Sequence, residues 1–292
     1  MPEAHTASAD AARNPPPAAL WPFAVRKALI GMVHVHALPG TPRARMEPEV
    51  IARQAAADAR LLASCGFDGV IIENMHDAPY IMGQQDPVVT AAMTAAAIAV
   101  RQAAPDLPLG VQVLACGNKE AMAIALVSGA AFIRCENFVF SHVADEGLMP
   151  RAEAGELLRY RRAIGAQRVL VYADIDKKHA SHALTADLSL EDETHGAEFF
   201  GAEGLIVTGS RTGSPTAVGD VRTVKEHCNL PVFGGSVVTP DTAESLWRHA
   251  DGLIVGSWYK KGGLWSSPPD ARRADKLVQA ATVARKRLAA GR

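Results

Sequence analysis

Short apolar segments rich in Val and Ile alternate with longer, alanine-rich segments from Leu29 to the end of the chain. Nearly continuous apolar segments of this length are typical of parallel strands whose two faces are both covered by helices. We expect eight strands, at residues 29–35, 69–73, 109–114, 132–135, 168–175, 204–207, 231–233 and 252–255. We expect helices near residues 48–64, 88–103, 119–128, 152–164, 190–200, 218–227, 241–249 and 269–288.

Strands that are each followed by a helix form either a closed barrel or an open, doubly wound sheet. The open sheet needs a glycine-rich first turn such as GxGxxG, whereas the first strand here ends in His34-Val35-His36. We therefore predict the α/β class and a single (β/α)8 TIM barrel over residues 25–292. Residues 1–24, rich in Ala and Pro, are expected to form a flexible tail that can dock through Trp21 and Phe23.

Glycines recur at one point of the predicted βα units, just after a helix and shortly before the next strand. They are Gly66, Gly129, Gly165 and Gly201. Glycine at this point is the usual left-handed C-cap of a helix, because it has no Cβ to clash. The regular recurrence supports one domain of repeated units.

Composition excludes several classes of partner. The 292 residues include 30 basic and 31 acidic side chains, so no net positive charge favours nucleic acid or an anionic membrane. No apolar run reaches the roughly 18 residues that span a bilayer, and we expect no secretory signal. The four cysteines show no CxxC spacing and are expected to be reduced thiols of a cytoplasmic protein.

Polar residues gather where the predicted strands end, which is where TIM barrels carry their chemistry. In chain order they are His34, His36, Glu73, Asn74, Asp77, Gln112, Arg134, Glu136, Asp145, Asp174, Asp176, Lys177, Lys178, His179 and Thr208. Alternation along a strand places His34 with His36, Arg134 with Glu136, and Asp174 with Asp176 on common faces. Other interpretations stay open: core imidazoles for the histidines, a buried pair for Arg134 and Glu136, solvated loop charges for Asp176 and Lys177, and a supporting role for Gln112.

The last two strands each end in small residues that are suited to a phosphate. Gly234-Gly235-Ser236 follows one strand and Gly256-Ser257 the next, and Gly209 follows the sixth strand. Glycines let an anion approach backbone N–H groups, and a helix N-terminus adds favourable partial charge. The pair matches the phosphate site that recurs after strands 7 and 8 of TIM barrels. The alternative is two ordinary tight turns.

The His-X-His pattern at His34 and His36 is also found in metal-dependent hydrolase barrels. Such a site needs a bridging lysine after the fourth strand, histidines after the fifth and sixth, and an aspartate after the eighth. Arg134, Thr208 and Ser257 stand at three of these places, which disfavours the hydrolase site. A divalent ion held by Glu73 and Asp174 with waters remains an open alternative. We expect no organic cofactor, and a covalent role for Lys177 or Lys178 is disfavoured because both look exposed.

Six blocks of sequence resemble one family. They are GMVHVHALPGTPR (31–43), DGVIIENMHDAPY (68–80), FIRCENFVFSHVADEGLM (132–149), ADIDKKHASHAL (173–184), VTGSRTGSPT (207–216) and ADGLIVGSWYKKGG (250–263). Together they resemble the BtpA/SgcQ family over about residues 29–285. The resemblance implies a TIM barrel related to phosphate-binding barrels, with a family name taken from photosystem I biogenesis. His36 stands where many members carry Pro or another apolar residue, so His34 is the better candidate.

The first hypothesis is an enzyme that acts on a small phosphorylated metabolite, a sugar phosphate or nucleotide-like compound, by isomerase, epimerase or lyase chemistry. Glu73 or Asp174 would be the general base, with His34 or Lys178 as acid. The predicted substrate contacts are Asn74, Asp77, Arg134, Glu136, Asp145, His179 and Thr208. The predicted phosphate contacts are Gly209, Gly234, Gly235, Ser236, Gly256 and Ser257.

Two other functions stay open. One is a non-catalytic assembly factor for a membrane complex, which would make contact through Trp258 and Trp265. The other is a nucleoside or sugar-nucleotide hydrolase. Barrels of this kind often associate through their outer helices, so a homo-oligomer is expected.

Overall fold

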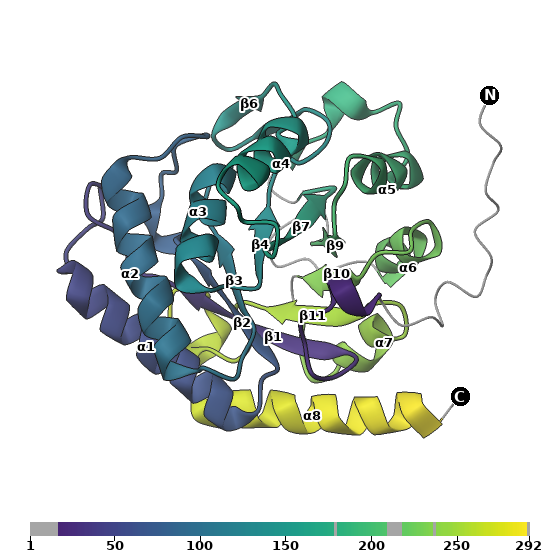
Figure 1. Cartoon of the computed structure of the whole chain (residues 1–292). Coiled ribbons are helices and arrows are strands. Elements are labelled where there is room, and N and C mark those ends of the chain that lie inside the picture. Colours follow the sequence, from purple (N-terminus) through teal and green to yellow (C-terminus); the bar gives the residue numbers. More distant parts are fainter. Residues whose placement is uncertain (1–16, 178–179, 209–217, 236–237, 291–292) are drawn as a thin grey trace.

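Eight parallel strands close into a barrel in the computed structural model, which describes residues 17–177, 180–208, 218–235 and 238–290 (Figure 1). In barrel order they are β1 (Ala28–His34), β11 (Gly252–Val255), β10 (Val232–Gly235), β9 (Gly204–Val207), β7 (Leu170–Ile175), β4 (Phe132–Cys135), β3 (Leu109–Gln112) and β2 (Gly69–Glu73). The predicted TIM barrel is confirmed, and every predicted strand coincides with one of these.

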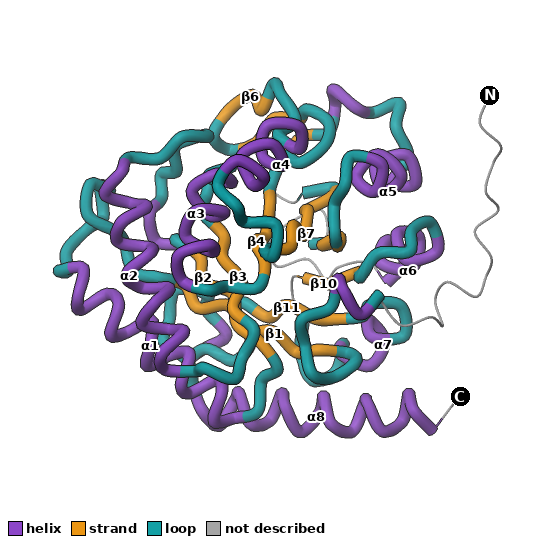
Figure 2. Tube along the Cα trace, in the orientation of Figure 1, coloured by secondary structure: helices purple, strands orange, loops and turns teal. Residues whose placement is uncertain are grey.

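Helices surround the strands, as Figure 2 shows with purple helices around the orange barrel. They are α1 (Pro48–Cys65), α2 (Pro87–Ala103), α3 (Asn118–Ser128), α4 (Ala154–Ala163), α5 (Leu190–Phe199), α6 (Val218–Glu226), α7 (Ala243–Trp247) and α8 (Ala271–Ala290). The four glycines predicted as C-caps all have positive φ, from 73° to 94°. Helix α7 has five residues and is shorter than the predicted 241–249.

Aromatic rings fill the inside of the barrel at the amino-terminal ends of the strands. Phe132, Tyr172 and Phe233 belong to one buried cluster with inward-facing Ile and Met side chains. Each ring lies over a glycine of a neighbouring strand in the barrel. A Cβ on Gly110 would be 2.3 Å from Phe132, and one on Gly204 would be 2.5 Å from Tyr172. Large and small side chains therefore alternate around the inside, as close packing requires.

The segment before β1 closes this end of the barrel. The Trp21 ring stacks on Phe233 with centroids 5.5 Å apart, and Phe23 meets Phe132 edge-on at 5.8 Å. The hydroxyl of Tyr172 donates a hydrogen bond to the backbone oxygen of Leu20 at 2.7 Å. Docking through Trp21 and Phe23 is therefore observed. The two rings contact the aromatic cluster inside the barrel and not its outer surface.

A small antiparallel sheet, which the sequence did not predict, stands beyond the carboxyl ends of β4 and β7. Its strands, in the order β6-β5-β8, are β6 (Gly147–Met149), β5 (His142–Ala144) and β8 (Ala180–Ser181). These strands have two or three residues each, which is too short for alternation to be recognised. Their positions matter because the loops that carry them also carry polar side chains toward the barrel mouth.

Substitution of Gly110 tests the packing inside the barrel. Gly110→Ala places a methyl group against the Phe132 ring, so we expect the free energy of unfolding to fall by about 1–3 kcal/mol in urea denaturation. Gly219→Ala is the matched control, because a Cβ there has no atom of the described residues within 4 Å. Equal stability of the two variants would contradict this description of the core.

Candidate active site

The carboxyl end of the barrel has a polar side and a side of small residues. Inward positions at the ends of five adjacent strands carry His34, Glu73, Gln112, Arg134 and Asp174, all buried. His34 pairs in register with Glu73, and Glu73 with Gln112, so these three side chains form one row. Gly235 and Gly256 lie at the ends of β10 and β11 on the other side. A small ligand in this mouth would touch charged groups on one side and bare backbone on the other.

Lys260, His34 and Glu73 form a chain of contacts across the mouth. Nζ of Lys260 lies 2.7 Å from Nδ1 of His34 and donates to the backbone oxygen of Trp265 at 2.8 Å. Nε2 of His34 lies 3.4 Å from Oε2 of Glu73. Lys260 comes from the loop after β11 and is only 2% exposed. The imidazole thus connects a buried amine to a buried carboxylate.

Nδ1 of His34 faces two groups of the loop after β11. Nζ of Lys260 lies 2.7 Å from it, and the backbone oxygen of Trp265 lies 3.0 Å from it. Burial lowers the pKa of Lys260 to about 8, against the opposing attraction of Asp58 and Glu73, so its ammonium form predominates at pH 7. In one tautomer Nδ1 accepts from this ammonium and the proton on Nε2 faces Glu73; in the other Nδ1 donates to the Trp265 oxygen. The first tautomer allows a proton to move between Glu73 and His34.

Arg134 and Asp174 form a buried, two-pronged ion pair. Nε of Arg134 lies 2.9 Å from Oδ1 of Asp174, and Nη2 lies 2.8 Å from Oδ2. The attraction of Asp174 raises the pKa of Arg134 although burial opposes it. Because both oxygens of Asp174 are bonded to Arg134, Glu73 is the better candidate for a general base.

Glu136 pairs with Lys177 and not with Arg134. Oε1 of Glu136 lies 2.9 Å from Nζ of Lys177, and Oε2 accepts a hydrogen bond from the backbone N–H of Cys116 at 3.0 Å. These partners lower the pKa of Glu136, although burial opposes them. The interpretation of Lys177 as a solvated loop charge is wrong, since its side chain is only 14% exposed. No local pattern relates Lys177 to Glu136, which lies on another strand.

Asn74 and Asp77 hold three loops together at the mouth. Oδ1 of Asp77 accepts from the backbone N–H of Leu38 at 2.8 Å, and its Oδ2 accepts from Nδ2 of Asn74 at 2.8 Å. Oδ1 of Asn74 accepts from the backbone N–H of Leu114 at 2.7 Å. Burial raises the pKa of Asp77. These bonds join the loops after β1, β2 and β3.

Gln112 differs from its neighbours. It is 1% exposed, and neither atom of its amide has a hydrogen-bond partner in the part of the chain that the structure describes. A supporting role through hydrogen bonds to a neighbour is therefore not seen. Buried amides are nearly always bonded, so an unpartnered amide beside Glu73 is a candidate contact for a bound molecule.

Two of the glycines predicted to hold phosphate face the mouth. A Cβ on Gly256 would lie 3.6 Å from the His34 ring, and one on Gly235 would lie 3.3 Å from Thr208. A Cβ on Gly234 would instead point at Leu253, toward the helices. Neither turn leads straight into a long helix, because α7 has five residues and α8 begins at Ala271. The expected contribution of a helix N-terminus to phosphate binding stays a prediction.

The other predicted site residues are distributed as follows. Thr208 is buried after β9, Ser257 is half-buried after Gly256, and Asp145 is exposed in the turn between β5 and β6. Lys178, His179, Gly209 and Ser236 lie outside the described residues.

The tryptophans proposed for a partner contact pack within the chain. The Arg273 guanidinium lies 4.6 Å over the Trp258 ring, and the Trp265 ring lies 5.0 Å from that of His76. Both side chains are half-buried, so a partner contact through their remaining exposed surface stays a prediction.

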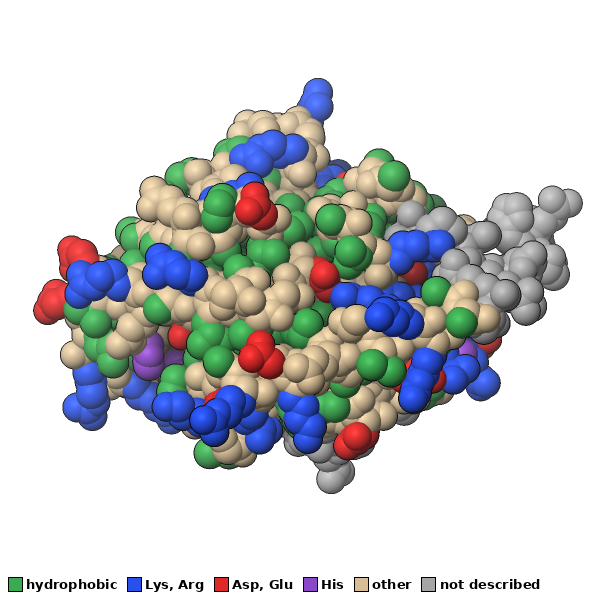
Figure 3. All heavy atoms as spheres, turned by 90° about the horizontal axis from the view of Figure 1, so that it is seen from below, with side chains coloured by type: hydrophobic (Ala, Val, Ile, Leu, Met, Phe, Trp, Pro, Cys, Tyr) green, Lys and Arg blue, Asp and Glu red, His purple; other side chains and the backbone are tan. Residues whose placement is uncertain are grey.

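Among the described residues, no three His, Cys, Asp or Glu side chains are grouped as metal ligands. In the same part of the chain, no helix combines the length and apolar character needed to cross a bilayer. On the face shown in Figure 3, basic, acidic and apolar side chains are interspersed.

Comparison with known proteins decides the family. A model described as the BtpA family matches residues 25–283. The chain belongs to the BtpA family. It is 34% identical over 259 residues to the photosystem I biogenesis protein BtpA of Synechocystis, which covers 88% of this chain and 89% of the relative. It is 40% identical over 258 residues to an uncharacterised mitochondrial protein of Caenorhabditis elegans, covering 87% of this chain and 92% of that one. The predicted cytoplasmic location of this BtpA family member stays a prediction.

Solved structures share the fold of this BtpA family member. Thiamine phosphate pyrophosphorylase from Pyrococcus furiosus superposes with a TM-score of 0.53 at 15% identity, over 88% of this chain and 96% of that one. N-(5'-phosphoribosyl)anthranilate isomerase from the same organism gives 0.53 at 11% identity, over 88% and 99%. At such identities the similarity concerns the fold alone.

Removal of the Asp174 charge from the Arg134–Asp174 pair should lower the stability of the protein strongly. Asp174→Asn leaves a buried guanidinium without its counter-charge, so the free energy of unfolding should fall by about 3–5 kcal/mol in urea denaturation. The double variant Arg134→Met, Asp174→Leu should be more stable than Asp174→Asn. Lys119→Met breaks an exposed pair with Glu156 and should change stability little. A mild effect of Asp174→Asn would contradict the pairing.

The lowered pKa of Lys260 makes the free energy of unfolding depend on pH. Between about pH 8 and its ordinary pKa of 10.5, Lys260 is neutral in the folded chain but still protonated in the unfolded chain. The unfolded state then binds more protons, so the contribution of Lys260 to stability rises with pH. The free energy of unfolding of the wild type, minus that of Lys260→Met, should therefore increase by about 3 kcal/mol from pH 8 to pH 10.5. The control is exposed Lys261→Met, and a flat difference for Lys260→Met would contradict the buried ammonium.

Proposed function

We propose that this protein is an enzyme that acts on a small phosphorylated metabolite by acid–base isomerase, epimerase or lyase chemistry. The observation that carries the proposal is the Lys260–His34–Glu73 chain, which lies directly beside the backbone of Gly256 at the mouth. An acid–base group and an anion-accepting backbone in one concave site are what a phosphorylated substrate requires.

Glu73 is the general base in this proposal. It takes a proton from substrate and returns it, while Nε2–H of His34 stabilises its charge and Lys260 holds the ring by Nδ1. The Gln112 amide, next to Glu73 in the row, donates to the substrate oxygen on which negative charge develops. Arg134 and Asp174 form a fixed charged wall that orients the substrate.

The phosphate lies against Gly235 and Gly256 in this proposal, because neither residue has a side chain to keep it from the backbone. The fold supports this assignment, since two barrels of similar fold are named for phosphorylated compounds, thiamine phosphate and 5'-phosphoribosylanthranilate. Ser257 and Thr208 stand at the same rim. The roles predicted for Lys178, His179, Gly209 and Ser236 stay predictions.

A second candidate is a non-catalytic assembly factor for a membrane complex, which the name of the Synechocystis relative favours. Trp258 and Trp265 are half-buried against Arg273 and His76, so such a factor would reach only their remaining exposed surface. It would not need an acid–base group beside bare backbone.

A thermal-shift screen tests phosphate binding. Sugar phosphates, nucleotides and inorganic phosphate are screened, and a ligand at 100 times its Kd should add about 2.7 kcal/mol of stability. Gly256→Ala should fold normally, because the new methyl group lies 3.6 Å from its nearest neighbour, yet it should abolish the shift by blocking the backbone. Gly219→Ala on α6 is the matched control and should keep the shift. If no phosphorylated compound stabilises the wild type, the assembly-factor function becomes the better one.

A further inference from the structure

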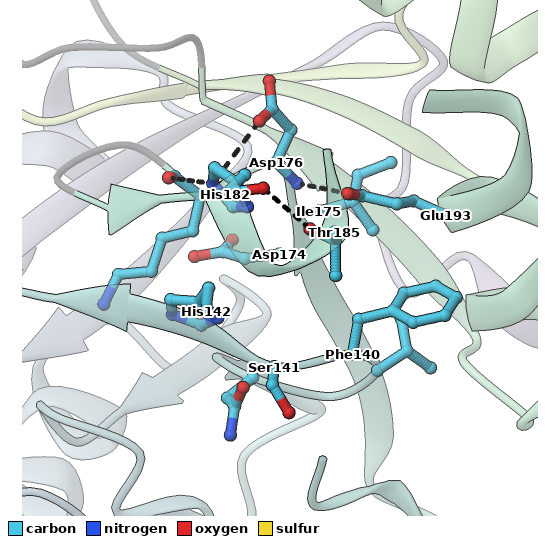
Figure 4. Close-up of a pocket in the computed structure, with 12 residues that line it drawn as sticks. Phe140, Ser141, His142, Asp174, Ile175, Asp176, His182, Thr185 and Glu193 are labelled. Carbon is cyan, nitrogen blue, oxygen red and sulfur yellow. Dashed lines mark hydrogen bonds and ion pairs between the residues drawn. The ribbon is translucent and has the colours of Figure 1, made fainter. Parts of the chain in front are cut away.

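A cavity adjoins the mouth between the ends of β4 and β7, the small sheet and α5 (Figure 4). Its free space is about 340 Å³, a volume that includes open solvent at its opening. Asp174 lines it, and the same carboxylate forms the ion pair with Arg134 in the mouth. The cavity therefore adjoins the candidate active site at Asp174, and no predicted role accounts for it.

Two buried polar atoms of the cavity lining have no hydrogen-bond partner among the residues that the structure describes. They are Nε2 of His142 and Oδ1 of Asn137, whose residues are each 5% exposed. The other side of the Asn137 amide donates to the backbone oxygen of Arg151 at 2.9 Å, which fixes Oδ1 as the unpaired acceptor. Burial lowers the pKa of His142 to about 4, so at pH 7 its ring is neutral and can donate at one nitrogen and accept at the other. Unpaired groups of this kind are rare in folded proteins and point to a missing partner.

The rest of the lining favours hydroxyl groups over anions. Asp176 and Glu193 place carboxylates at the cavity, and Oε2 of Glu193 accepts from the backbone N–H of Asp176 at 3.2 Å. A phosphate would be repelled by these carboxylates, whereas hydroxyl groups can donate to them. Lys177 also lines the cavity, but its ammonium is paired with Glu136 at 2.9 Å. Phe140 adds an apolar wall, as the C–H face of a sugar requires.

We infer that this cavity is a subsite for the hydroxyl-rich, unphosphorylated end of a sugar phosphate, bound by His142 and Asn137. The inference rests on the proposed function, in which the phosphate end of the same molecule lies at Gly235 and Gly256. A hydroxyl group suits the site because it can donate to Oδ1 of Asn137 and also bond either tautomer of His142. The substrate is thus a polyhydroxylated compound and not a phosphorylated aliphatic acid.

Calorimetric titration separates the two ends of the ligand. The probes are ribose, glucose, ribose 5-phosphate, glucose 6-phosphate and inorganic phosphate. His142→Phe keeps the ring beside His182 but removes both nitrogens, so sugars and sugar phosphates should bind about tenfold more weakly. Inorganic phosphate should bind as it does to the wild type. The control is His195→Phe on the exposed side of α5, which should change nothing.

A second variant tests the same subsite in case His142→Phe does not fold. Asn137→Gly suits the left-handed backbone at this position, where φ is 53°, and should weaken the same sugars by a similar factor. If sugars and sugar phosphates bind both variants as they bind the wild type, or bind none of the three proteins, the subsite is overturned. If inorganic phosphate fails to bind while the sugars bind and depend on His142, the phosphate assignment fails and the subsite stands.

Discussion

The packing of aromatic rings over glycines at the amino-terminal end of the barrel is the constraint on which the rest of the structure depends. Phe132, Tyr172 and Phe233 each fill the space that a neighbouring glycine leaves, and Trp21 and Phe23 close the end below them. With this half of the interior filled by apolar side chains, the inward positions nearer the carboxyl ends can carry polar groups. Burial of aromatic area offsets the cost of placing charges there.

Those charges fall into two groups by the chemistry of their partners. Arg134 with Asp174, and Glu136 with Lys177, are ion pairs of a carboxylate with a strongly basic cation. Glu73 instead lies 3.4 Å from an imidazole, that of His34, and Lys260 contacts the other nitrogen of this ring. A carboxylate beside an imidazole, with a buried amine whose pKa is lowered to about 8, suits proton exchange near pH 7.

The sequence predicted the barrel well and its charge pairings poorly, for physical reasons. Strands such as Gly204–Val207 are short apolar runs, and their signal is local. His34 and Glu73 were found because each ends a strand. Lys260 was missed because it follows β11 by several residues in a loop, and only the folded chain brings it to His34. Lys177 was misjudged for the same reason, since its partner Glu136 belongs to another strand.

The central claim is that Glu73 moves protons on a phosphorylated substrate, and hydrogen exchange in D2O measures this directly. Each phosphorylated compound that stabilises the protein is incubated with it in D2O, and carbon-bound hydrogen is followed by proton NMR. We expect at least one compound to take up deuterium at one carbon, and Glu73→Gln to slow this uptake at least about 100-fold. Exchange that is unchanged in Glu73→Gln, or absent for every compound that binds, would contradict it.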